Sequence, residues 1–168
     1  MNTWPQPSKS TPIPAPFLTM ETAVAVTLKD TGRKKILVVD DSPIILKTLT
    51  MKLKAEGYEV LTAEDGSKAV STARRERPDL ILLDIIFPPD VAHGGGVPWD
   101  GFLIMDWLKR MDEAKDIPVF IITGGDPERY KSRSMAAGAA GFFQKPIDNA
   151  KLIEAIQNEL GDPTDAPA

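Results

Sequence analysis

Residues 78–89, PDLILLDIIFPP, contain an uninterrupted apolar run that ends in a single carboxylate, Asp84. Positions 80–83 hold no polar residue, so we expect a strand that is covered on both faces, as in the centre of a parallel sheet. Ligands of open parallel sheets bind beyond the carboxyl ends of the strands, where Asp84 would lie. The position therefore favours a functional carboxylate, and the alternative is a solvated acid that closes a strand.

The same alternation of buried strand and amphipathic helix continues on both sides of this segment. Before it, KILVVDD at 35–41 predicts a strand that ends in two acids, and Ser42-Pro43 predicts the cap and first turn of a helix. Further strands are predicted at 58–63, 117–123 and 140–145, and further helices begin at 65, 126 and 148. A helix with a core-facing stripe is predicted from the spacing of Ile104, Trp107, Leu108 and Met111. Five strands alternating with five helices indicate a doubly wound α/β domain, because parallel neighbours need crossover helices.

Composition limits the functions that this chain can have. It has 168 residues, no cysteine and a formal net charge of −4. The length fits one domain with tails, and the missing thiols exclude disulfides and thiolate metal sites. The acidic balance argues against binding nucleic acid by bulk electrostatics, and no apolar run approaches the roughly 20 residues of a membrane span. We expect a cytoplasmic protein that contacts neither nucleic acid nor membrane, with a Pro-rich disordered tail and linker at 1–33, a folded domain at 34–160 and a disordered tail at 161–168.

Polar side chains follow four of the predicted strands and would meet at one edge of the sheet. Asp40 and Asp41 follow the first strand and Asp84 the third, while Thr123 ends the fourth and Lys145 the fifth. Three neighbouring carboxylates repel one another unless a cation joins them, and Mg²⁺ prefers such oxygen ligands. Lys145 and Thr123 add an ammonium and a hydroxyl that suit a phosphoryl group. The pattern predicts a site at which a carboxylate becomes an aspartyl-phosphate.

The ordered set Asp40-Asp41, Asp84, Thr123 and Lys145-Pro146 resembles the receiver domains of two-component response regulators. The resemblance covers residues 34–160 and implies a flavodoxin-like strand order, 2-1-3-4-5, with helices on both faces. By this resemblance Asp84 is the phospho-acceptor. Mg²⁺ is the implied cofactor, held by the following groups: Asp40, Asp41, Asp84 and the backbone carbonyl of Ile86.

The resemblance also assigns roles to residues around the acceptor. Lys145 pairs with the phosphoryl group and precedes a cis peptide bond, which is tolerated mainly before proline. Thr123 hydrogen-bonds the phosphoryl group, and Phe142 is the aromatic switch that turns inward as Thr123 moves. In the family, the residues two positions beyond the acceptor and the threonine affect how water reaches the aspartyl-phosphate. Here these are Ile86 and Gly125, which have no polar side chain to orient water, so we expect slow self-hydrolysis.

The implied function is that of a phospho-accepting response regulator, acting in a two-component system or a phosphorelay. A histidine kinase or a histidine phosphotransfer protein would supply the phosphoryl group, and the protein would catalyse only its own phosphorylation and dephosphorylation. No helix-turn-helix pattern is visible, so we expect the signal to leave by protein contact through the fourth helix, fifth strand and fifth helix. Arg129, Lys131 and Arg133 in that helix would meet an acidic partner.

Two other classes of protein share part of this pattern. A flavodoxin-like electron carrier has the same topology, but Asp40 and Asp41 would repel the phosphate of FMN. A haloacid-dehalogenase-type phosphatase also forms an aspartyl-phosphate, but its two acids stand two residues apart, whereas Asp40 and Asp41 are adjacent. A receiver that has become a purely structural module is disfavoured by the intact set of acids, threonine and lysine.

The segment 88–101, PPDVAHGGGVPWDG, is longer than the corresponding loop of the family. Asp90 and His93 within it could reach a metal, but a ligand pair without a third partner is a weak signal, so a solvated loop is favoured. Trp99 is expected to pack at the base of this loop. The acid-glycine pair that usually begins the third helix is displaced to Asp100-Gly101.

Overall fold

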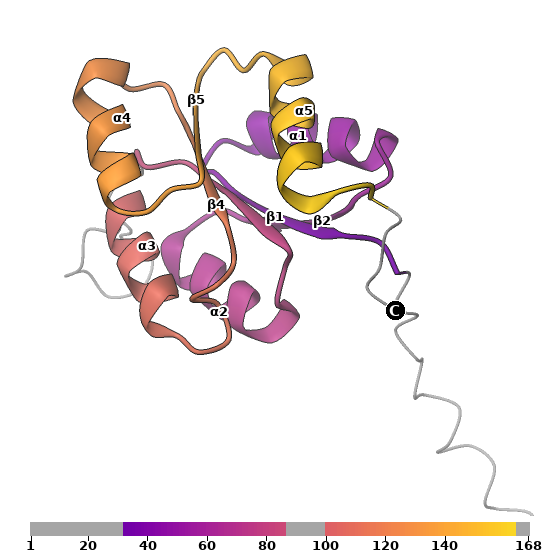
Figure 1. Ribbon diagram of the computed structural model, residues 1–168, viewed down its shortest axis with the longest axis horizontal. Helices are drawn as coiled ribbons and strands as arrows, with labels where there is room; N and C mark the ends of the chain where they lie inside the picture. The colour runs from indigo at the N-terminus through magenta and orange to yellow at the C-terminus, as the bar shows by residue number, and fades with distance from the viewer. Residues whose placement is uncertain (1–31, 87–99, 164–168) are drawn as a thin grey trace, which may run out of the picture. The chain divides into compact units, whose positions relative to one another are not determined.

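The computed structural model describes residues 32–86 and 100–163. Within them, five parallel strands form one sheet in the order β2-β1-β3-β4-β5, with a helix after each strand (Figure 1). The doubly wound fold and its strand order are therefore confirmed. The strands are β1 (Lys35–Val39), β2 (Glu59–Ala63), β3 (Leu80–Leu83), β4 (Val119–Thr123) and β5 (Gly141–Gln144). The helices are α1 (Pro43–Ala55), α2 (Gly66–Glu76), α3 (Gly101–Arg110), α4 (Pro127–Ala136) and α5 (Asn149–Leu160).

Helices cover both faces of the sheet. Ile36 and Val38 of β1 join an apolar cluster with α1 and α5, whereas Leu37 and Val39 join a second cluster with α2 and α3. This division follows from the pleat, because successive side chains of a strand point to opposite faces. Figure 1 shows α1 and α5 together on one side of the sheet and α2 and α3 on the other. All four residues of β3 are buried, as the sequence of that segment predicted.

Capping side chains fix where each helix begins. In every case a side-chain oxygen accepts a hydrogen bond from an amide of the first turn, which satisfies a donor that has no partner within the helix. The capping residues, in chain order, are Ser42, Asp65, Asp100, Asp126 and Asp148. Each of these caps lies in the connection that leaves the carboxyl end of a strand, so the caps also shape the edge of the sheet that holds the polar residues.

The prediction that Trp107 faces the core is wrong. Trp107 is 49% exposed, whereas Met105 is 1% exposed and joins Ile104 and Leu108 in the core. Successive helix residues are rotated by roughly 100°. Ile104, Met105 and Leu108 therefore share one side of α3, together with buried Gly101, and Trp107 lies outside that arc. The sequence allowed two phases for the apolar stripe, and packing against the sheet selected the one that contains Met105.

The described chain continues slightly beyond the predicted domain boundary. The amide of Lys34 donates to the carbonyl oxygen of Pro163 at 3.1 Å, so residues 161–163 contact the domain where the sequence suggested the start of a tail. Three predicted segments lie outside the described residues. They are the N-terminal tail apart from residues 32 and 33, the loop that contains Asp90, His93 and Trp99, and the C-terminal tail from residue 164 onward. Among the described residues, no helix has the length and apolar character needed to span a membrane.

Candidate functional site

The structure brings four of the predicted site residues to one edge of the sheet. Asp40, Asp84 and Lys145 each follow a strand directly, and Thr123 is the last residue of β4. Backbone hydrogen bonds extend the sheet to these positions: the amide of Asp84 donates to Val39 at 2.9 Å, and the amide of Lys145 donates to Thr123 at 2.8 Å. The side chains are thus positioned by the ladder of the sheet itself.

The Lys145 ammonium joins the two buried carboxylates of the site. Its Nζ lies 2.5 Å from Asp40 Oδ2 and 2.6 Å from Asp84 Oδ2. Asp40 is fully buried and Asp84 is 4% exposed, so neither carboxylate has full access to solvent. Buried charges are tolerated when they are paired and hydrogen-bonded, and a single ammonium supplies both partners here.

Burial and pairing shift the ionisation of these groups. Burial raises the pKa of Asp40, although hydrogen bonds from Lys145 and from the Ser42 amide oppose the shift. Burial alone would lower the pKa of Lys145, but hydrogen bonds to Asp40 and Asp84 outweigh it, so its pKa is raised. Lys145 therefore remains an ammonium at neutral pH and balances negative charge in the site.

Backbone amides orient both carboxylates. The amide of Ser42 donates to Asp40 Oδ1 at 2.9 Å, and the amide of Ile86 donates to Asp84 Oδ1 at 3.0 Å. Each buried carboxylate is thus fixed at one oxygen by a backbone amide and at the other by Lys145. A carboxylate held in this way presents its oxygens in a defined direction, which is what attack on an incoming phosphorus atom needs.

Asp41 completes a cluster of three carboxylates. One oxygen each from Asp40, Asp41 and Asp84 lies within 4.8 Å of the others, close enough for a single ion to contact all three. Asp41 is exposed, so the cluster opens to solvent on its side. A set of hard oxygen donors that is open to water matches the preference of Mg²⁺, which keeps several waters when it binds to proteins.

Thr123 and Phe142 occupy neighbouring strands. Thr123 is fully buried, and its Oγ1 accepts a hydrogen bond from the Gly125 amide at 3.1 Å. Phe142 lies on β5 in register with Ile121 of β4, partly buried against the cluster under α2 and α3. The peptide bond between Lys145 and Pro146 is cis, as the resemblance implied.

Gly101 has a positional role that the sequence did not reveal. A Cβ atom at this position would lie 2.5 Å from the Ile85 Cα and 2.6 Å from the Asp84 carbonyl oxygen. The start of α3 therefore packs directly on the backbone of Asp84 and Ile85, and any side chain at position 101 would displace the helix. The glycine of an acid-glycine pair was visible in the sequence, but its contact with Asp84 depends on how α3 approaches β3.

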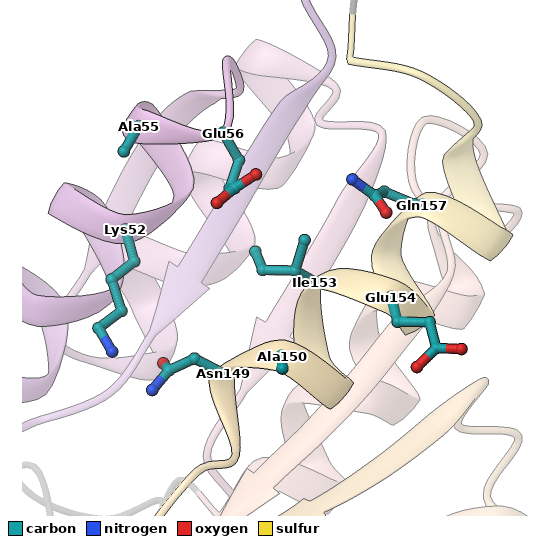
Figure 2. Close-up of a pocket in the computed structure, with 8 residues that line it drawn as sticks. All are labelled: Lys52, Ala55, Glu56, Asn149, Ala150, Ile153, Glu154 and Gln157. Carbon is teal, nitrogen blue, oxygen red and sulfur yellow. The ribbon is translucent and has the colours of Figure 1, made fainter.

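A separate hollow of about 410 Å³ lies between α1 and α5. Figure 2 shows Lys52 of α1 and Glu56, which follows that helix, across from Ile153 and Gln157 of α5. None of the predicted site residues lines it, so it is distinct from the acidic cluster.

A five-stranded doubly wound domain with three acids, a threonine and a lysine at one sheet edge defines the class of phospho-accepting receiver domains. Comparison with known proteins agrees: the sequence profile of the response regulator receiver domain matches residues 36–157. The chain belongs to this family.

Similar proteins include regulators of little more than one receiver domain. PilH of Pseudomonas aeruginosa is 38% identical over 126 residues, which are 75% of this chain and 97% of PilH. The chemotaxis protein CheY4 of Vibrio cholerae matches with a TM-score of 0.66 and 30% identity, over 76% of this chain and 99% of that chain. The receiver domain of the sensor histidine kinase PA1611 from P. aeruginosa PAO1 matches with a TM-score of 0.66 and 26% identity, over 77% of this chain and 98% of that chain. That structure has a magnesium ion coordinated in its active-site cleft.

Proposed function

We propose that Asp84 accepts a phosphoryl group from a phosphohistidine donor and that the receiver surface passes the signal on by protein contact. The observation that carries this proposal is the pairing of one ammonium, Lys145, with two buried carboxylates at the ends of β1 and β3. Such an arrangement holds an acceptor carboxylate in place and keeps a cation beside the position where the phosphoryl group would arrive.

Each residue has a defined part in the transfer. An Asp84 carboxylate oxygen bonds to phosphorus while the bond between phosphorus and the donor histidine nitrogen breaks, which leaves the imidazole free. Lys145 balances the added negative charge, and the Thr123 hydroxyl donates a hydrogen bond to a phosphoryl oxygen. When Mg²⁺ is bound, it supplies further positive charge for the phosphoryl oxygens. Its ligands would be Asp40, Asp41, Asp84 and the backbone carbonyl of Ile86.

The partners follow from this chemistry. A histidine kinase or a histidine phosphotransfer protein would supply the phosphoryl group in the cytoplasm. The match covers nearly the whole of PilH and of CheY4, so a receiver domain makes up almost all of each of these two relatives. The outgoing signal would use α4, β5 and α5, with Phe142 responding to Thr123. Arg129, Lys131 and Arg133 are all exposed on α4 and suit an acidic partner.

Receiver domains are signalling modules, and we propose that this one catalyses only its own phosphorylation and dephosphorylation. Family membership does not favour the alternative of a general phosphatase or an electron carrier. A phosphatase would turn over a chromogenic phosphate ester, and an electron carrier would absorb visible light through its flavin.

Intact mass after incubation with acetyl phosphate tests the proposed function. Wild type should gain one phosphoryl group when Mg²⁺ is present and none when it is chelated, because the acid cluster repels the incoming anion without it. Asp84→Asn should gain none. Equal labelling of Asp84→Asn and wild type, or labelling that ignores Mg²⁺, would show that the acceptor or the metal requirement is wrongly assigned.

A further inference from the structure

The opening beside the acceptor is flanked by two residues that lack polar side chains. Asp84 directly follows β3, and Thr123 is the last residue of the neighbouring strand β4. Ile86 and Gly125 come two positions after them, so both lie at the same edge of the sheet as the acidic cluster. Their backbone amides contact the site directly: Ile86 donates to Asp84 Oδ1 at 3.0 Å and Gly125 donates to Thr123 Oγ1 at 3.1 Å. A side chain that packs over Ile86 and Gly125 would therefore also lie beside a phosphoryl group on Asp84.

Tyr130 of α4 occupies the space that a side chain at position 125 would need. A Cβ atom on Gly125 would lie 2.6 Å from both Cδ2 and Cε2 of the Tyr130 ring and 2.9 Å from Cδ1 of Ile86. Both side chains therefore border the space into which a Cβ atom of residue 125 would project. Since a real Cβ atom essentially never comes so close, glycine at 125 and tyrosine at 130 are matched to each other.

The ring is held in this position by α3 and by its own helix. Phe102 of α3 stacks against Tyr130 with ring centroids 6.5 Å apart and planes inclined by 24°. The guanidinium of Arg129 lies 5.2 Å from the centroid of the Tyr130 ring. Tyr130 is half-buried and packs at the margin of the core cluster beneath α3. These contacts give the aromatic side chain a fixed place beside Gly125.

We propose that Tyr130 of α4 forms an apolar cover over Gly125 that slows hydrolysis of the aspartyl-phosphate. This inference rests on the proposed function of Asp84. In hydrolysis a water oxygen bonds to phosphorus, the bond between phosphorus and the Asp84 oxygen breaks, and inorganic phosphate leaves while the proton of the water goes to phosphate or solvent. A ring over Gly125 excludes that water and offers it no hydrogen bond from its carbon surface. Tyr130 would thus lengthen the lifetime of the phosphorylated state by limiting the access of water.

The experiment follows the loss of phosphoryl mass from the full-length protein after acetyl phosphate has been removed by desalting, with Mg²⁺ present throughout. Tyr130→Ala should hydrolyse on the order of tenfold faster than wild type, equivalent to about 1.4 kcal/mol of activation free energy. Tyr130→Phe should decay at the wild-type rate, because the ring and not the hydroxyl provides the cover. Gly125→Leu combined with Tyr130→Ala should return decay toward the wild-type rate, since an apolar side chain would refill the vacated space from the other partner.

Lys109→Ala is the matched control for a general loosening of α4. Lys109 donates to the carbonyl oxygen of Ala137, just beyond the far end of this helix. Its loss should loosen that end while the contacts of the Tyr130 ring with Phe102 remain. Its decay rate should equal that of wild type. Equal acceleration in Lys109→Ala and Tyr130→Ala, an unchanged rate in Tyr130→Ala, or a changed rate in Tyr130→Phe would each overturn the proposed cover.

The failure of the proposed function would look different. In that case wild type would not gain a phosphoryl group at Asp84 at all, and there would be no aspartyl-phosphate for Tyr130 to protect. If Tyr130→Ala does not fold, as judged by circular dichroism, Tyr130→Leu takes its place, and an intermediate acceleration is expected from the smaller apolar side chain.

Discussion

A single lysine balances the site in the state that the structure shows. Lys145 contacts both Asp40 Oδ2 and Asp84 Oδ2, so two carboxylates that are almost completely buried share one counter-charge. The same ammonium would meet the phosphoryl oxygens once Asp84 is modified. Its position therefore links the resting electrostatics of the domain to the proposed transfer, because the phosphoryl group would compete with the carboxylates for the same cation.

Removing this ammonium should destabilise the protein mainly when Mg²⁺ is absent. Lys145→Ala leaves two buried carboxylates without their partner, and we expect its free energy of unfolding to fall by about 1–3 kcal/mol. Added Mg²⁺ should stabilise this variant more than wild type, because the acid cluster remains and no cation competes for it. Urea unfolding with and without Mg²⁺ measures both effects. Lys151→Ala, which removes an exposed lysine from α5, is the control, and an equal effect of Mg²⁺ on Lys145→Ala and wild type would contradict the expectation.

At the scale of elements, α4 is less firmly held than the helices on the other face. Ser134 is its one buried residue, whereas α1 buries Leu46, Leu49 and Leu53. Its contacts with α3 are largely aromatic and cationic: Tyr130 stacks on Phe102, and the Arg133 guanidinium lies 3.8 Å from the centroid of the Phe102 ring. An element with few buried apolar contacts opens at a lower free energy than the core. This suits a helix that is proposed to respond to the acceptor.

Amide hydrogen exchange should show this difference directly. Amides of α4 are expected to exchange faster than those of α1, and Phe102→Ala should accelerate α4 further while leaving α1 unchanged, because Phe102 contacts both Tyr130 and Arg133. Trp107→Ala is the matched control, because Trp107 lies on the exposed side of α3, the helix that also carries Phe102. Its loss should leave hydrogen exchange in α4 unchanged. Protection of α4 equal to that of α1 would count against a loosely held helix.

The sequence predicted the elements well and the contacts between them less well. Buried strands such as 80–83 are recognisable because both faces are apolar, and the acids at their ends are recognisable because charges rarely end such runs. The side of α3 that faces the core is harder to predict: the helical spacing of Ile104, Trp107, Leu108 and Met111 favours Trp107, and only packing shows that Met105 faces the sheet. The close packing of the Tyr130 ring beside Gly125 could not be predicted, because no spacing or motif in the sequence links these two residues.

Charge is unevenly distributed over this protein. The chain carries a net charge of −4, yet α4 presents Arg129, Lys131 and Arg133 to solvent. A basic helix on an acidic protein favours an acidic protein surface over nucleic acid, whose binding needs a broader positive face. The Tyr130 ring, which lies beside Gly125 two residues beyond Thr123, belongs to this same helix.

The set of bound proteins should therefore depend on phosphorylation and on the charge of α4. A ligand shifts a two-state domain only through its different affinities for the two states, so a true partner must bind phosphorylated and unphosphorylated protein unequally. Wild type treated with acetyl phosphate and Mg²⁺ should retain partners that Asp84→Asn does not, or release partners that it keeps. Lys131→Glu should weaken that phosphorylation-dependent binding, while Lys54→Glu, which reverses an exposed charge on α1, should not. Quantitative mass spectrometry of captured proteins provides the measurement. Identical partner sets for wild type and Asp84→Asn, or retention of the protein on DNA at physiological salt, would contradict signalling by protein contact through this face.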